Sequence, residues 1–193
     1  MNPTTVSRQH GIGVLLAATV LATACAAPAF AADPAAQALA AADAPPAPLR
    51  LHAPREGLLT AGQPGAGDWQ ALAAKGVATV IDLRTDGERP GRDERAEVTA
   101  AGMAYHAIPV AGAEALTADN ASRLWTLLQG APGTVLVHCA SANRAGALLA
   151  LAAAQHGAMT PVDALAFGRA AGLSSPVLEA DVRARLGLPD SND

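Results

Sequence analysis

The sequence predicts an α/β fold: a three-layer sandwich with a central, mostly parallel β-sheet between two layers of helices. Three observations support this. Two apolar, β-branched runs, VATVIDL (residues 77–83) and TVLVH (residues 134–138), are typical of buried parallel strands. Helical patterns alternate with the strands through short connections, as in βαβ units. With 193 residues and 51% hydrophobic residues, the chain is long enough to bury a substantial core.

The elements follow in order along the chain. Residues 58–59 lead into a short strand that ends at the turn signal GQP, residues 62–64. Asp68 is expected to cap a helix that ends at Gly76, and the strand 77–83 comes next.

A second helix is expected over residues 93–101 and a third strand over residues 104–110. Thr117 is an N-cap for a helix that ends at Gly130. The strand 134–138 then leads into a helix over residues 143–156.

A helical C-terminal tail completes the predicted domain. The pairs Thr160-Pro161 and Ser175-Pro176 each combine an N-cap with a proline at the first helical position. Two further helices therefore begin there, and Gly172 and Gly187 are their expected stops.

The two ends of the chain have a different composition. Residues 1–31 predict a secretory signal peptide: a polar start with Arg8, an apolar run and a small-residue cleavage site. Residues 32–54 predict a flexible Ala/Pro-rich linker, residues 55–188 a single globular domain, and residues 189–193 a disordered tail. We expect a secreted, periplasmic protein. A lipoprotein acylated at Cys25 is the second-ranked alternative.

Charge and histidine spacing exclude several classes of partner. The net charge is −4 and Lys75 is the sole lysine, which argues against a nucleic-acid partner. No membrane partner is expected after the signal peptide is cleaved. The histidines that remain then lack metal-ligand spacing with the acidic residues, so we predict no metal and no cofactor.

The candidate catalytic residues lie where the strand 134–138 gives way to a helix. We call residues 139–144, from Cys139 to Arg144, the cradle loop. A helix N-terminus presents free N–H groups and a positive dipole end, and Arg144 adds a guanidinium suited to oxyanions. Both lower the expected pKa of the Cys139 thiol. The alternative is a buried strand-end cysteine beside a surface arginine.

The remaining candidates surround these two residues. The substrate-binding candidates are His138, Ala140, Ser141, Ala142, Asn143 and Arg84. Arg84 is included because the carboxyl ends of parallel strands share one rim of the sheet.

Four stretches, residues 60–88, 102–110, 135–146 and 163–173, resemble the cysteine-dependent protein phosphatase superfamily. The most similar branch is the phosphatase-like domain of beta-lactamase hydrolase-like proteins. The resemblance implies a dual-specificity-phosphatase-like fold. It also implies hydrolysis of phosphate monoesters, phosphotyrosine among them, through a phosphocysteine on Cys139. The expected partner is a phosphate- or sulfur-containing small substrate or a phosphoprotein.

Three departures from the phosphatase pattern keep alternatives open. Four residues rather than five separate Cys139 from Arg144, as in rhodanese sulfurtransferases, which form a cysteine persulfide. Ala142 replaces a usual glycine, and Ala145 replaces a usual Ser or Thr. The chain could also be an oxyanion-binding module that has lost catalysis.

The proton donor for the leaving group is the least defined of the candidates. Phosphatases of this type carry an Asp about thirty residues before the cysteine, and this chain reads IPVAGAE there. Glu114 is the candidate acid. Asp119 is explained by the favourable position of an acid in the first turn of a helix.

Overall fold

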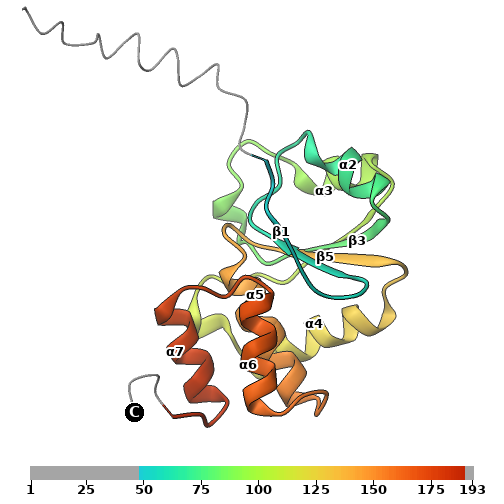
Figure 1. The fold of residues 1–193 in the computed structure, drawn as a ribbon. Helices are drawn as coiled ribbons and strands as arrows, with labels where there is room; N and C mark the ends of the chain where they lie inside the picture. Colours follow the sequence, from blue (N-terminus) through green and yellow to red (C-terminus); the bar gives the residue numbers. More distant parts are fainter. Residues whose placement is uncertain (1–47, 190–193) are drawn as a thin grey trace, which may run out of the picture. The chain divides into compact units, whose positions relative to one another are not determined.

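The computed structural model describes residues 48–189, which form a five-stranded sheet between two layers of helices (Figure 1). This confirms the predicted α/β three-layer sandwich. The predicted signal peptide and most of the predicted linker and tail lie outside the described residues.

The sheet has the order β1-β2-β5-β3-β4. β1 pairs antiparallel with β2, and the other neighbouring strands are parallel, so the sheet is mostly parallel as predicted. The strands are β1 (Leu51–Arg55), β2 (Leu58–Ala61), β3 (Val77–Asp82), β4 (Ala104–Ala107) and β5 (Thr134–His138).

The predicted linker boundary at residue 54 needs correction, because β1 begins at Leu51. The strand escaped sequence reasoning because LHAPR has little apolar character and contains Pro54. An edge strand tolerates proline and needs burial on only part of its surface. No residue of β1 is fully buried, and it occupies one edge of the sheet.

Helices cover both faces of the sheet (Figure 1). α2 (Asp68–Ala74) and α3 (Glu94–Ala100) lie on one face, and the remaining helices lie on the other. These are α4 (Ala118–Gly130), α5 (Asn143–Gln155), α6 (Pro161–Ala170) and α7 (Pro176–Arg185); two 3-10 turns, η1 (Asp86–Glu88) and η2 (Ala113–Ala115), interrupt the loops.

The predicted N-cap residues cap their helices at the positions expected from the sequence. The side chains of Thr117, Thr160 and Ser175 each accept a hydrogen bond from a backbone N–H of the turn that follows. Gly172 and Gly187, just beyond α6 and α7, have positive φ angles of 98° and 68°. One expectation changes in detail: Asp68 is the first residue of α2, and its carboxylate accepts from the N–H of Gly65.

Successive residues of β5 face opposite sides of the sheet. Val135, Val137 and Cys139 belong to the larger apolar core, under α4 to α7. Leu136 belongs to the smaller core that includes Trp69 of α2, and the His138 ring lies edge-on to Trp69 at a centroid distance of 6.1 Å. The sequence neighbours His138 and Cys139 therefore lie in different environments.

α5 and α6 approach each other backbone to backbone. A Cβ added at Gly146 would lie 2.5 Å from the carbonyl oxygen of Gly168, and one added at Gly168 would lie 2.8 Å from that of Gly146. Both positions must therefore remain glycine for these helices to pack at this distance.

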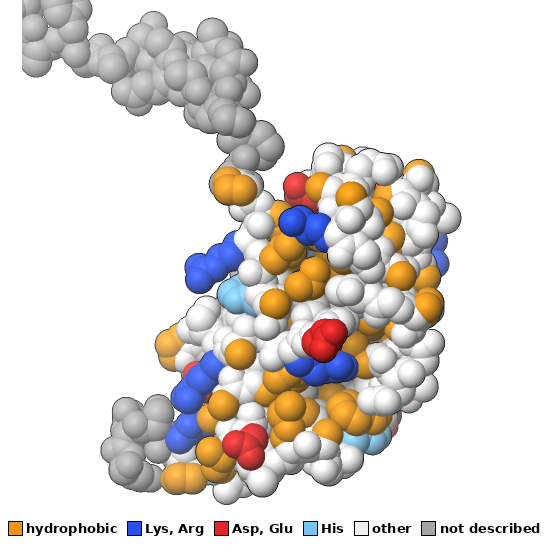
Figure 2. All heavy atoms as spheres, turned by 45° about the vertical axis from the view of Figure 1, so that its right-hand side comes forward, with side chains coloured by type: hydrophobic (Ala, Val, Ile, Leu, Met, Phe, Trp, Pro, Cys, Tyr) orange, Lys and Arg blue, Asp and Glu red, His pale blue; other side chains and the backbone are white. Residues whose placement is uncertain are grey.

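The surface mixes charged and apolar groups. On the face shown in Figure 2, basic and acidic side chains are scattered among apolar and uncharged atoms. Within residues 48–189, no helix combines the length and apolar character that crossing a membrane requires.

Candidate active site

The cradle loop lies between the end of β5 and the start of α5, and β2 holds its outer side. Gly62 forms an isolated bridge with Ser141, and the N–H of Gln63 donates to the carbonyl of Ala140 at 3.3 Å. Ala140 and Ser141 are exposed. These bonds use peptide groups on the β2 side of the loop and fix its path.

Ala142 has φ 67° and ψ −16°, the left-handed conformation, and precedes the first residue of α5. It is the one non-glycine residue with positive φ among the described residues. A Cβ in this conformation costs about 1 kcal/mol. Ala142, which replaces the glycine usual in phosphatases, therefore has the backbone strain that we expected there.

The Asn143 side chain connects the loop to the segment between α6 and α7. Its Oδ1 accepts from the backbone N–H groups of Ser174 at 2.7 Å and Ser175 at 2.6 Å. This carbonyl oxygen is therefore used in the fold. What Asn143 can offer a substrate is its backbone N–H at the start of α5.

Arg144 uses only part of its guanidinium within the protein. Nη1 donates to Glu88 Oε1 at 2.8 Å and to the Val110 carbonyl at 2.6 Å, and Nη2 donates to Glu88 Oε2. A guanidinium has five N–H groups in a rigid fork. The two that remain, on Nε and Nη2, donate to no oxygen or nitrogen of the described residues and lie side by side, as a bidentate oxyanion contact requires. The guanidinium also interacts with the Cys139 sulfur.

Cys139 is completely buried and forms no disulfide within the described residues. The pKa of Arg144 is raised, first by its hydrogen bond to Glu88, and the nearby Cys139 sulfur contributes to the same rise. The fold thus brings the thiol and the guanidinium together, as predicted from the motif. The thiol lies at the base of the loop rather than at its surface.

Glu88 was not among the predicted site residues, although its carboxylate holds the Arg144 guanidinium. The hydrogen bond from Arg144 is the main reason that the pKa of Glu88 falls to about 2. The Glu88 carboxylate also accepts from the backbone and hydroxyl groups of Thr85. The Thr-x-x-Glu spacing of a capping box signalled the turn, but nothing local indicated a partner 56 residues away.

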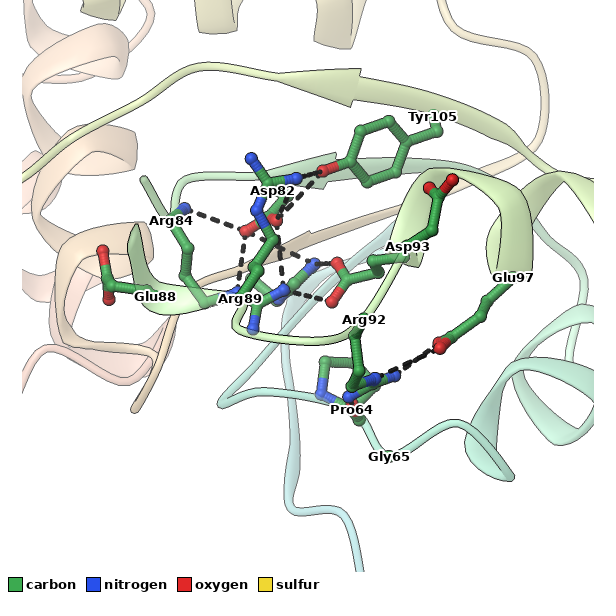
Figure 3. A network of polar contacts seen from close by, with 12 residues as sticks. Pro64, Gly65, Asp82, Arg84, Glu88, Arg89, Arg92, Asp93, Glu97 and Tyr105 are labelled. Carbon is green, nitrogen blue, oxygen red and sulfur yellow. Dashed lines mark hydrogen bonds and ion pairs between the residues drawn. The ribbon is translucent and has the colours of Figure 1, made fainter. Parts of the chain in front are cut away.

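The predicted role of Arg84 in substrate binding is wrong. Its guanidinium is fully buried and donates to both oxygens of Asp82 at 3.1 Å (Figure 3). It also contacts the Glu94 carboxylate. Burial alone would raise the pKa of Asp82, but the hydrogen bonds from Arg84 hold it below its usual value. Arg84 follows β3 at the expected rim, yet its side chain points into a closed polar network.

The structure also changes the interpretation of His138. This side chain is fully buried, and its Nε2 lies 2.9 Å from Glu94 Oε1 and 3.7 Å from Asp82 Oδ1. It faces the α2–α3 side of the sheet, opposite the core that contains Cys139, so it does not reach a substrate beside Cys139.

Asp82, Glu94 and His138 form a cluster that sequence spacing did not reveal. One potential ligand atom from each lies within 4.8 Å of the others. Arg84 already donates to both carboxylates of this cluster. The positive charge that two buried carboxylates require is therefore supplied by the protein itself.

The candidate acid Glu114 and the neighbouring acid Asp119 lie beyond the strand β4. Glu114 is exposed on η2, in the loop that starts at Val110, and its carboxylate lies over Gly112. Asp119 is in the first turn of α4, as the dipole explanation expects. Since the Val110 carbonyl accepts from Arg144, the loop that carries Glu114 begins at the cradle.

Comparisons with known proteins agree with this site. The profile of the family described as "Beta-lactamase hydrolase-like protein, phosphatase-like domain" matches residues 49–158. A beta-lactamase hydrolase-like protein of Xylella fastidiosa (strain 9a5c) is 36% identical over 128 residues, which cover 64% of this chain and 30% of that protein. The chain spans less than a third of the length of the curated relatives it matches.

Solved structures show the same fold. A candidate phosphatase from Shewanella putrefaciens CN-32 is 26% identical, with a TM-score of 0.54 over 70% of this chain and 92% of that one. P. aeruginosa TpbA, solved as a cysteine-to-serine variant with phosphotyrosine, is 23% identical, with a TM-score of 0.54 over 68% and 78% of the two chains. The chain therefore belongs to the family of phosphatase-like domains of beta-lactamase hydrolase-like proteins, and it has the fold of the cysteine-based phosphatases.

Proposed function

We propose that this domain hydrolyses phosphate monoesters with Cys139 as the nucleophile. One observation carries the proposal: at the N-terminus of α5, the Arg144 guanidinium interacts with the Cys139 sulfur and keeps two adjacent N–H groups that donate to no oxygen or nitrogen of the described residues. Backbone donors, a helix dipole and a guanidinium edge together fit the oxygens of a phosphoryl group.

The proposed reaction has two steps. The Cys139 thiolate attacks phosphorus, an S–P bond forms, and the P–O bond to the alcohol breaks while Arg144 stabilises the equatorial oxygens. Water then attacks the phosphocysteine, the S–P bond breaks, and inorganic phosphate leaves with the thiolate restored. Because Ala145 lacks the hydroxyl that phosphatases usually carry there, we expect the second step to limit the rate.

Glu114 is the proposed donor of the proton to the leaving alcohol oxygen. Glu88 cannot serve, because its pKa of about 2 leaves it ionised at neutral pH. Glu114 lies on the loop that begins at the cradle, and its exposure allows it to approach a bound substrate.

Sulfur transfer is the second candidate function. The Glu88 carboxylate in contact with Arg144 is ionised at neutral pH, and a persulfide on Cys139 needs no proton donor. In that reaction the thiolate attacks the outer sulfur of thiosulfate and releases sulfite, and a thiol then accepts the sulfur. The four-residue spacing of the cradle loop permits it.

One comparison of substrates tests both functions. Purified protein should release p-nitrophenol from p-nitrophenyl phosphate in a burst followed by slower turnover, and Cys139→Ser should abolish both phases. A phosphoryl group on Cys139 after acid quench identifies the intermediate by mass spectrometry. Thiosulfate consumption without ester hydrolysis would favour sulfur transfer instead, and turnover retained by Cys139→Ser would reject this nucleophile for either reaction.

We also propose that the domain acts after export, because residues 1–31 have the pattern of a secretory signal peptide. Cell fractionation and N-terminal sequencing of the full-length protein test this. Cytoplasmic protein that retains its first residues would contradict it, and an acylated Cys25 would favour the lipoprotein alternative.

A further inference from the structure

A hollow of about 310 Å³ adjoins the cradle loop. Its walls are loop residues 140–142, the turn residues Gly62 and Gln63, the segment that leads into β1, with Arg50, and His52 of β1. The bonds of Gly62 and Gln63 to the loop make these walls continuous with the cradle.

The charge of this hollow differs from that of the whole chain. Arg50 and His52 are among its lining residues, none of which is Asp or Glu, although the chain has a net charge of −4. Arg50 is exposed and carries a permanent positive charge, and an imidazole can donate a hydrogen bond in either protonation state. The hollow is therefore suited to an anionic group.

The His52 side chain has a defined place. A Cβ added at Gly172 would lie 3.1 Å from His52 Nε2 and 2.7 Å from the Cβ of Ala142. The Thr60 hydroxyl donates to the carbonyl of Ala171 at 2.7 Å and holds the neighbouring segment. His52 thus packs beside the residue at which the cradle loop turns into α5.

The geometry of the proposed reaction indicates which part of the substrate the hollow could bind. In an in-line displacement the alcohol oxygen leaves on the side opposite the attacking sulfur, so the alcohol part of the substrate extends out of the cradle. We infer that the hollow receives this part and selects phosphate monoesters whose alcohol carries a second anionic group. The inference rests on the proposed hydrolysis.

The size of the hollow restricts the substrate further. Ligand pockets commonly range from about 300 to 1,000 Å³, and this one lies at the lower end. It fits one ring or one amino-acid side chain. The substrate class is a small anionic aryl or alkyl phosphate, or a single phosphorylated side chain with an adjacent carboxylate.

The test uses two esters that differ in charge and little in shape, para-carboxyphenyl phosphate and para-carbamoylphenyl phosphate. We expect the ratio of their kcat/KM values, charged over neutral, to fall about fivefold in Arg50→Gln, mainly through KM. Any intrinsic difference in leaving group cancels between protein variants. His52→Ala should lower the same ratio by a smaller factor.

Arg55→Gln is the matched control, because Arg55 is an exposed arginine at the other end of β1 and does not line the hollow. It should leave the ratio unchanged. Hydrolysis of both esters with the same ratio in wild type and Arg50→Gln would overturn the inference while the proposed function stands.

Absence of any ester hydrolysis would instead reject the proposed function. Calorimetric titration of Cys139→Ser protein with each ester then decides the inference by itself. About fivefold tighter binding of the carboxylate ester, lost in the added Arg50→Gln change, supports it; equal binding of the two esters overturns it.

Discussion

Arg84 and Arg144 both follow a buried parallel strand, or its adjoining loop, at the same rim of the sheet, but their surroundings differ. Asp82 and Glu94 enclose the guanidinium of Arg84, which is fully buried. Glu88 and Val110 hold Arg144 on one side, and its other edge faces no further oxygen or nitrogen acceptor among the described residues. We therefore expect an arginine at the rim to bind a substrate only when one edge of its guanidinium is not enclosed by protein carboxylates.

We expect the largest change in stability when Arg84, the enclosed arginine, is replaced. Arg84→Met leaves the buried Glu94 carboxylate without its arginine partner and leaves Asp82 with the longer contact to Arg89 at 3.7 Å, so we expect a loss of about 3–5 kcal/mol in the free energy of unfolding. Urea denaturation measures it. Arg92→Met removes a partly exposed ion pair with Glu97 and should cost at most about 1 kcal/mol. Similar losses of unfolding free energy in both variants would mean that the buried Arg84 network stabilises the fold no more than an exposed ion pair does.

The open arginine should affect activity rather than stability. Arg144→Lys keeps a positive charge near Glu88 but lacks the fork for two phosphoryl oxygens. We expect kcat/KM for p-nitrophenyl phosphate to fall about 100- to 1,000-fold with little change in unfolding free energy. Full activity in this variant would show that the free edge does not contact the substrate.

Glu88 should contribute a stability that depends on pH. Its pKa falls from 4.5 to about 2 on folding, so its stabilising effect is complete above about pH 5 and disappears as the pH falls toward 2. Because the carboxylate is partly exposed, we discount for solvent screening and expect Glu88→Gln to cost about 1–2 kcal/mol at pH 7.

Urea denaturation at about pH 7 and pH 3 measures this difference between wild type and Glu88→Gln. The difference should shrink at the lower pH. Glu56→Gln, at an exposed position on the turn between β1 and β2, is the matched control and should change little at either pH. A cost for Glu88→Gln that does not vary with pH would exclude the ion pair as its source.

The smallest expected effect is a gain in stability from a substitution at Ala142. Ala142→Gly removes the Cβ from a left-handed residue and should stabilise the protein by about 0.5–1 kcal/mol. Ala140→Gly, at a loop residue without positive φ, should be neutral or destabilising. Thermal unfolding of the two variants distinguishes backbone strain from a general tolerance of glycine in the loop.

Local patterns predicted the strand β5, the cradle loop and α5, because an apolar run, a short loop and a helical pattern are contiguous in sequence. Helix starts at Thr160 and Ser175 were predictable for the same reason. β1 was missed because its residues are only partly buried. Each successful prediction needed information from one stretch of chain.

The errors concern side chains whose partners are distant in sequence. Arg84 was placed correctly at the rim, but the direction of its side chain depends on Glu94 in α3. His138 lies against the same glutamate, 44 residues earlier in the chain. His138 and Cys139 are adjacent in sequence and face opposite helical layers. Sequence spacing alone cannot show which residue faces which layer, because this depends on how both layers pack on the sheet.

The close approach of Gly146 and Gly168 limits how this site can be transplanted. A protein engineer who moves the loop and its helix into another scaffold would leave Gly146 against whatever side chain the host presents. The smallest portable unit therefore includes α6, and combinatorial libraries should keep both glycines constant.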